Sequence, residues 1–180
     1  MMNGKDIGGL AKAAQSTYRL IGEAGRRLHG NSDEFREGVS AYLVVSAADG
    51  EEFLSLLLGR KEGDRARIAR LGTSAREKSR RLAIRFRENG EYASWQSRDD
   101  MSGQYGGAVV LPVGGTEYIF SVCGLTEEAD EAVAMLIAER FAPGERPLAE
   151  RCFDILERTG NTVFGMLHDE IAEVGEAAYA

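Results

Sequence analysis

The spacing of hydrophobic and polar residues changes several times along the chain, and each change marks a predicted element. From residue 10 to 24, apolar side chains recur every three or four positions, which predicts an amphipathic helix that begins near Asp6. Gly30-Asn31 is a typical helix stop. Two short apolar runs then follow at 39–47 and 52–59, separated by an Asp-Gly turn signal. These runs predict a first hairpin of largely buried strands.

Helical spacing returns after a basic, glycine-flanked loop. Apolar or small residues form a stripe from Asp64 onward, and Asn89-Gly90 ends the pattern. One long helix is therefore predicted, with most of its arginines on the faces away from the stripe. The segment 91–96 has the composition of a short strand, and residues 97–107 form the longest loop-like stretch of the chain. Loops of this length inside a compact domain are usually functional or mobile.

The stretch from Gly106 to Glu139 organises the second half of the chain. Two runs rich in β-branched and aromatic residues, 108–113 and 116–123, flank Gly114-Gly115. Glycine accepts the positive φ of a tight turn, so this pattern predicts a second hairpin. Thr126 is a candidate N-cap for a helix whose first residues are acidic and favour the positive end of the helix dipole.

The last part of the chain, from Pro147 to Tyr179, carries a second helical pattern that Gly160 kinks or divides. Its apolar residues exceed what one helical face needs; they are Phe153, Ile155, Leu156, Val163, Phe164, Met166, Leu167, Ile171 and Val174. An uncovered stripe of this kind is rarely tolerated by a monomer. The sequence therefore predicts that this tail packs on the domain or on a partner subunit, and that the protein is a homo-oligomer.

The order of these elements predicts an α+β fold. We expect an antiparallel sheet of about five strands covered by helices, in a domain spanning 1–146, with a C-terminal helical extension at 147–180. At 180 residues the chain has the size of a single domain. Hydrophobic residues make up 43% and charged residues 28%, which is typical of globular proteins.

Location follows from what the sequence lacks. No apolar run approaches the length that crosses a bilayer, and the first residues do not have the pattern of a secretory signal. The two cysteines, Cys123 and Cys152, do not form a CxxC pair, so neither a disulfide framework nor structural zinc is predicted. We expect a cytoplasmic protein without membrane contact, in which Cys123 behaves as a small hydrophobic residue.

The net charge of −7 conceals a strong asymmetry. Residues 60–87 hold eleven of the 22 basic residues and three acids, so this segment carries +8 and the remainder −15. A solvated face, or contact with an acidic surface of another copy, is the interpretation we favour. Binding of anionic carboxylates by Lys78, Arg80 or Arg81 is the alternative. Nucleic acid is the least favoured partner, because the segment has a single aromatic residue, Phe86, on the apolar stripe.

The sequence shows no catalytic constellation. The chain has two histidines: His29 lies at the predicted end of the first helix, and His168 lies in the tail between polar neighbours. Neither accompanies a nucleophile in a recognisable motif, and GxSxG, HExxH and Walker patterns are absent. A role at a helix end or on a solvated surface is the simpler interpretation of both residues. Either could instead ligate haem iron through a neutral ring nitrogen.

Two segments carry a family resemblance. The stretch GGAVVLPVGGTEYIFSVCGLTEEADE and the upstream AREKSRRLAIRF resemble the GlcG/HbpS-type haem-binding family, over about residues 38–141. The resemblance implies a profilin-like sheet and a site for haem or a related tetrapyrrole. It also implies that two acids near the helix start, Asp130 and Glu131, are site residues. The candidate cofactor-binding residues are Lys78, Arg81, Trp95, Tyr105, Gly106, Gly107, Gly124, Asp130 and Glu131.

Each group in this list has a structural alternative. The glycines can let the backbone enter a crowded sheet rather than line a ligand. The acids can serve as helix-dipole partners. Two other functions therefore stand beside ligand binding: an oligomeric structural or regulatory module without a cofactor, and an accessory protein of small organic-acid metabolism, which the family's associations imply.

Overall fold

The computed structural model describes residues 2–29, 40–59 and 64–177. Its elements in chain order are α1 (Gly4–His29), β1 (Ala41–Ala47), β2 (Glu52–Leu58), α2 (Arg65–Asn89), the short 3-10 helices η2 (Ser94–Ser97) and η3 (Asp100–Ser102), β3 (Ala108–Val113), β4 (Thr116–Cys123), α3 (Glu127–Phe141), α4 (Arg146–Thr159) and α5 (Val163–Ala177). The predicted stop at Gly30-Asn31 lies outside the described residues, and so does the side chain of His29.

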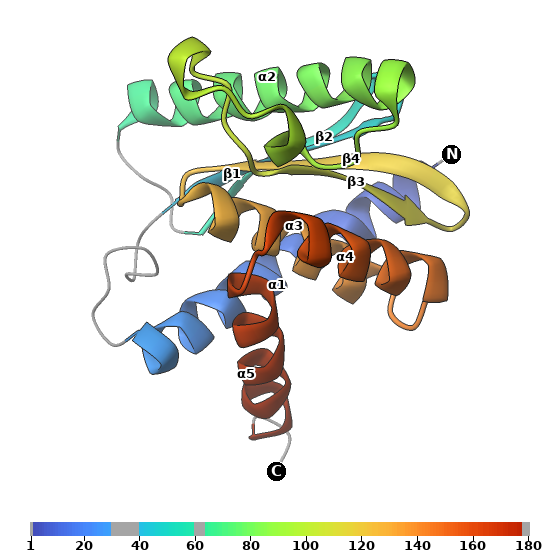
Figure 1. Cartoon of the computed structure of the whole chain (residues 1–180). Coiled ribbons are helices and arrows are strands. Elements are labelled where there is room, and N and C mark those ends of the chain that lie inside the picture. The colour runs from blue at the N-terminus through green and yellow to red at the C-terminus, as the bar shows by residue number, and fades with distance from the viewer. Residues whose placement is uncertain (1, 30–39, 60–63, 178–180) are drawn as a thin grey trace.

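The strands form one antiparallel sheet in the order β2-β1-β4-β3. Helix α2 crosses one face of this sheet, while α1 and α3 cover the other (Figure 1). Helix α4 contacts β3 and α3, and α5 packs on α1 and α3. The predicted α+β class and antiparallel sheet are therefore confirmed. Within the described residues, no helix combines the length and apolar character that crossing a membrane requires.

The strand expected at 91–96 is wrong, and within the described residues the sheet has four strands rather than about five. Ala93 makes a single bridge to Val109, and η2 follows at once. The side chain of Gln96 accepts hydrogen bonds from the backbone N–H groups of Tyr92 and Ala93, at 2.9 and 3.0 Å. These local bonds bend the chain where a strand would have to continue.

Local sequence signals explain the elements that were predicted correctly. The Asp64 carboxylate caps α2 by accepting from the N–H of Arg67 at 3.0 Å, and Gly90 ends the helix in the left-handed region. Gly114 and Gly115 have φ values of 58° and 75°, as the tight turn between β3 and β4 requires. Thr126 is the N-cap of α3, as the sequence predicts.

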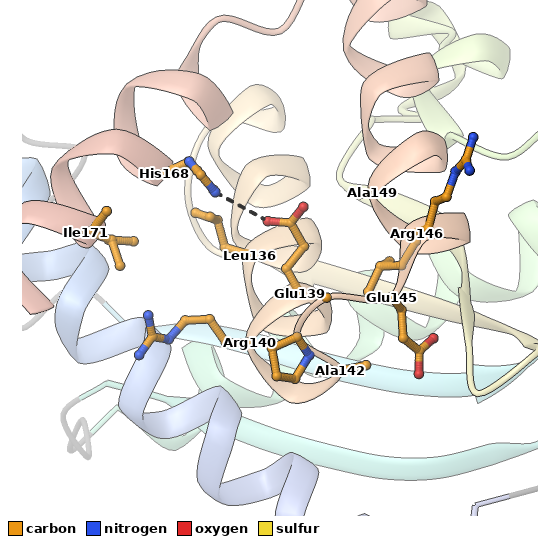
Figure 2. A pocket seen from close by; sticks show the side chains of 13 residues that line it. Leu136, Glu139, Arg140, Ala142, Glu145, Arg146, Ala149, His168 and Ile171 are labelled. Carbon is orange, nitrogen blue, oxygen red and sulfur yellow. Dashed lines mark ion pairs between the residues drawn. The ribbon is translucent and has the colours of Figure 1, made fainter.

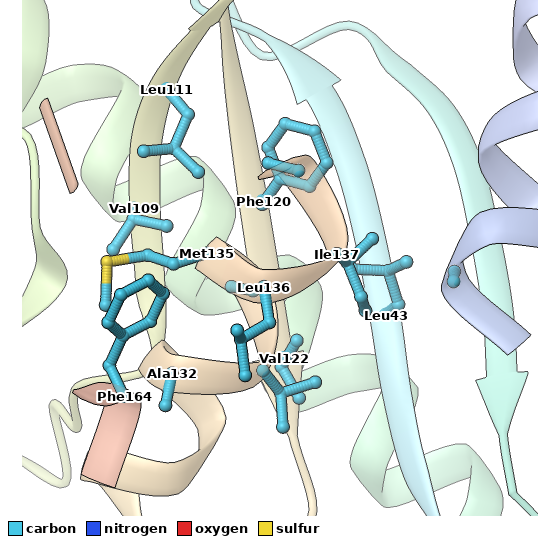
Figure 3. Packing of buried hydrophobic residues seen from close by; sticks show 14 of the residues in the cluster. Leu43, Val109, Leu111, Phe120, Val122, Ala132, Met135, Leu136, Ile137 and Phe164 are labelled. Atoms are coloured by element: carbon cyan, nitrogen blue, oxygen red, sulfur yellow. The ribbon is translucent and has the colours of Figure 1, made fainter. Parts of the chain in front are cut away.

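The larger part of the core lies between the sheet and the α1–α3 layer. Figure 3 shows strand side chains such as Val109, Phe120 and Leu43 facing Met135 and Ile137 of α3. Helix α3 is buried along most of its length, which explains why its sequence is apolar on nearly every face. A smaller cluster around Leu82 fills the space under α2.

Most of the apolar tail is covered within the chain itself. Ile155, Phe164, Leu167 and Ile171 are buried, whereas Phe153 is 61% and Met166 is 40% exposed. The side chain of Val174 lies outside the described residues. The sequence argument for self-association assumed an uncovered stripe, and this packing removes that assumption. Self-association stays a prediction that needs a different surface.

Candidate functional site

Lys78 and Asp130 form an ion pair inside the protein. The Nζ atom of Lys78, on α2, lies 3.0 Å from Oδ2 of Asp130, in the first turn of α3, and their side chains are 5% and 2% exposed. Lys78 Nζ also donates to the carbonyl of Val122 at 3.1 Å, and the N–H of Leu125 donates to Oδ1 of Asp130 at 3.0 Å. Burial raises the pKa of Asp130 to about 6, against the opposing effect of the Lys78 charge. The Lys78 ammonium favours the ionised form of the carboxylate, to which it donates a hydrogen bond.

Gly107 lies against this ion pair, at the end of the loop before β3 (residues 103–107). Its φ is +102°, and a Cβ at this position would lie 2.7 Å from Cβ of Asp130 and 2.9 Å from Nζ of Lys78. The chain can pass over the ion pair because residue 107 has no side chain. Gly124 has a similar role at the end of β4, where a Cβ would lie 2.6 Å from the carbonyl oxygen of Ser40.

The loop before β3 is fixed by a second set of polar contacts. The N–H of Gly106 donates to Oε2 of Glu127 at 2.8 Å, and Arg98 Nε lies 3.4 Å from the same oxygen. The guanidinium of Arg98 also lies over the ring of Trp95, 4.7 Å from its centroid. One face of Trp95 is therefore already occupied by a cation from the same chain.

Arg81 and Tyr105 meet at the outer edge of this loop. Arg81 pairs with Glu77 one turn earlier in α2, at 3.0 Å, and donates a hydrogen bond to the backbone carbonyl of Tyr105. The Tyr105 side chain is 48% exposed. Arg81 thus holds the loop against α2.

Glu131 lies in a different environment from the other candidates. It is 2% exposed, and its Oε1 atom accepts from Thr159 at 3.1 Å and from Asn161 at 3.2 Å, where α4 meets α5. Its Oε2 atom is buried without a hydrogen-bond partner among the described residues. Burial raises the pKa of Glu131 to about 7. This residue therefore joins α3 to the α4–α5 turn and does not face the loop before β3.

The structure brings the other eight predicted residues together, but their contacts do not fit a haem. Lys78 is buried and paired with Asp130, so it cannot meet a propionate. The spaces beside Gly106 and Gly107 are filled by side chains of this chain, with Trp95 and Glu127 on Gly106. We interpret this cluster as a structural joint, by which we mean a set of contacts that holds α2, β4 and α3 together.

A groove between the end of α3, the start of α4 and one face of α5 offers more room (Figure 2). Its volume is about 580 Å³, within the range of small-molecule sites. The apolar part of its lining consists of Leu136, Ala142, Pro143, Gly144, Leu148, Ala149, Ile171 and Ala172. Polar side chains come from Glu139, Arg140, Glu145, Arg146 and His168. The break at Pro143-Gly144 separates α3 from α4 on this side.

His168 and Glu139 face each other in the groove. His168 Nε2 lies 3.9 Å from Oε2 of Glu139 (Figure 2). Its Nδ1 atom lies 3.4 Å from Oδ1 of Asp169. Burial raises the pKa of Glu139, and the nearby imidazole opposes that rise. A half-exposed imidazole beside apolar side chains is a possible haem ligand, and Arg140 and Arg146 on the lining could meet anionic groups.

Other chemistry has less support. Within residues 2–29, 40–59 and 64–177, no three His, Cys, Asp or Glu side chains form a group that could hold a metal ion. Both cysteines are free, and burial raises the pKa of each thiol, so neither has the character of an activated nucleophile.

Comparisons with known proteins add little to this geometry. No protein-family model matches the sequence, and no curated protein matches it either. Among solved structures, the chain is similar to the crystal structure of Klebsiella pneumoniae protein ORFY, which is assigned to the family DUF336. The two share 14% sequence identity with a TM-score of 0.40, over 75% of this chain and 91% of that chain. A likeness of this size carries no inference about ligands or site residues.

Proposed function

We propose that this protein binds a small, largely apolar ligand in the groove between α3, α4 and α5, and that haem is the first candidate. The groove itself is the observation that carries the proposal, because it combines an apolar lining, a volume of about 580 Å³ and a few polar groups. His168 would supply a ring nitrogen to the iron, and Arg140 or Arg146 would meet the propionates. Bound haem would supply an iron centre for electron transfer or for binding a further small molecule.

The family resemblance in the sequence supports the same class of ligand. It implies a haem-binding protein with a profilin-like sheet, and the helices on both sheet faces support that finer fold assignment. We therefore propose a divergent member of the GlcG/HbpS type whose ligand lies against the C-terminal helices.

Titration with haem, followed by the Soret band, tests this proposal. We expect a shifted Soret peak with saturable binding to the wild-type chain. His168→Ala should remove the shift. His29→Ala is the matched control, because these are the two histidines of the sequence, and it should bind as the wild type does. No saturable binding to the wild type, or loss of binding in His29→Ala alone, would refute the proposal.

A second function is favoured by the filled cluster around Lys78. If the loop before β3 is only a structural joint, the protein could act as a structural or regulatory module without a cofactor. The same titration separates the two functions, since a module without a cofactor would leave the absorption spectrum of added haem unchanged.

A further inference from the structure

Helix α2 carries a basic stripe with an apolar centre on its outer face. Arg80, Ile84 and Arg87 are spaced four and three residues apart, so they follow one line along the helix, away from the residues that α2 buries against the sheet. All three side chains are exposed, and 47% of Ile84 is accessible although it is aliphatic. Neither arginine forms an ion pair with another described residue. The stripe is therefore unpartnered in the part of the chain that the structure describes.

Helix α4 carries a stripe of the opposite charge, also with an apolar centre. Glu150, Phe153 and Glu157 are spaced three and four residues apart, on the side opposite to the residues that α4 buries. Both acids are exposed, and so is 61% of Phe153. Glu150 pairs with Arg146 at 2.7 Å on the open surface, whereas Glu157 has no ion pair among the described residues. Each helix thus presents an exposed apolar side chain between two charges of one sign.

The two stripes match residue by residue in one register. When the helices lie antiparallel with Ile84 opposite Phe153, the charges on each side are equally far from this centre: Arg80 and Glu157 at four residues, Arg87 and Glu150 at three. At 1.5 Å per residue these steps are about 6 Å and about 4.5 Å along both helices. Each arginine therefore lies opposite an acid, and the two apolar side chains meet. Parallel helices with the same charges aligned would instead place Ile84 against Asp154.

We propose that the outer face of α2 binds the outer face of α4 in a second copy of this chain, antiparallel and in this register. Charge complementarity specifies the occupant, because the chain itself supplies an acidic stripe with the spacing that the basic stripe requires. Helices α2 and α4 lie on opposite sides of the sheet (Figure 1), so the contact is head-to-tail and each copy keeps one free stripe. Copies then assemble into a closed ring or an open chain. The contact does not depend on a ligand in the groove.

Charge reversal at Arg80 and Glu157 tests the contact in the full chain. Light scattering behind a sizing column, over a series of protein concentrations, should give a wild-type mass that rises above the 19.6 kDa of one chain. Arg80→Glu and Glu157→Arg should each raise the Kd of association by about tenfold or more, because like charges then face each other. Arg26→Glu is the matched control, since it makes the same change at an exposed residue of α1 and should associate as the wild type does.

Mixing the two reversed chains separates a lost contact from a lost fold. In an equimolar mixture of Arg80→Glu and Glu157→Arg, each α2 can again meet an α4 of opposite charge, so association should return to the wild-type Kd. The chain that carries both substitutions should also associate as the wild type does. A wild type that stays at 19.6 kDa up to about 1 mM, single reversals that associate normally, or a mixture no better than its components would overturn the proposal.

Discussion

Glu131→Gln should make the stability of the protein less dependent on pH. In the folded chain the pKa of Glu131 is raised to about 7 from an ordinary value of 4.5, mainly by burial, while Asn161 and Thr159 oppose the rise. Charges on Glu127 and Glu128 raise it further. A carboxyl group whose folded pKa is raised binds its proton more tightly in the folded state.

The sign and size of the effect follow from linkage. Below pH 4.5 Glu131 makes its full contribution to stability, because the carboxyl group is protonated in both states. Between pH 4.5 and about 7 the unfolded state releases this proton and the folded state keeps it, so the contribution is lost as the pH rises. The two pKa values differ by about 2.5 units, so the loss is about 3 kcal/mol at 1.36 kcal/mol per unit. Glutamine cannot ionise, and its amide oxygen can still accept from Asn161 and Thr159.

Urea unfolding at pH 5, 6, 7 and 8 measures this difference. We expect the free energy of unfolding of Glu131→Gln, relative to wild type, to rise by about 2–3 kcal/mol between pH 5 and pH 8. Glu88→Gln, an exposed acid in α2, is the control and should change by less than about 0.5 kcal/mol. A difference between Glu131→Gln and wild type that is the same at pH 5 and pH 8 would refute the reasoning.

Three further substitutions test the packing by urea unfolding. Lys78→Met leaves Asp130 as a buried charge without its partner and should cost about 3–5 kcal/mol; a loss below about 1 kcal/mol would contradict the ion pair. Gly107→Ala should cost at least about 1–3 kcal/mol more than Gly114→Ala, since both have positive φ but only residue 107 has neighbours within 4 Å, and equal losses would show that the close approach is not present. Phe164→Ala should cost about 3–5 kcal/mol at every protein concentration, because the ring is buried in its own chain; a loss that depends on concentration would place the tail at a subunit interface.

Much of the fold could be predicted from the sequence because its signals are local. The hairpin at 108–123, the long helix ending at Gly90 and the cap at Thr126 each depend on neighbouring residues alone. The segment 91–96 could not be predicted in this way. Its composition suits a strand, but the side chain of Gln96 binds the backbone N–H groups that a strand would use.

The sequence grouped residues whose site role stays a prediction. Lys78, Gly107 and Asp130 do lie together, yet the sequence could not show that they fill each other's space, because that depends on the distance between α2 and α3. The groove beside His168 was missed for a similar reason. Its walls come from three helices, and no pattern within one helix specifies how it packs against the other two.

Two variants compared in one haem titration test most directly where the ligand binds. His168→Ala changes the groove between α3, α4 and α5, whereas Tyr105→Phe changes the loop before β3 that the sequence alone favours. If the groove is the site, His168→Ala loses the Soret shift and Tyr105→Phe keeps both the shift and the wild-type affinity. Loss of binding in Tyr105→Phe, with full binding in His168→Ala, would contradict the account and return the ligand to the loop.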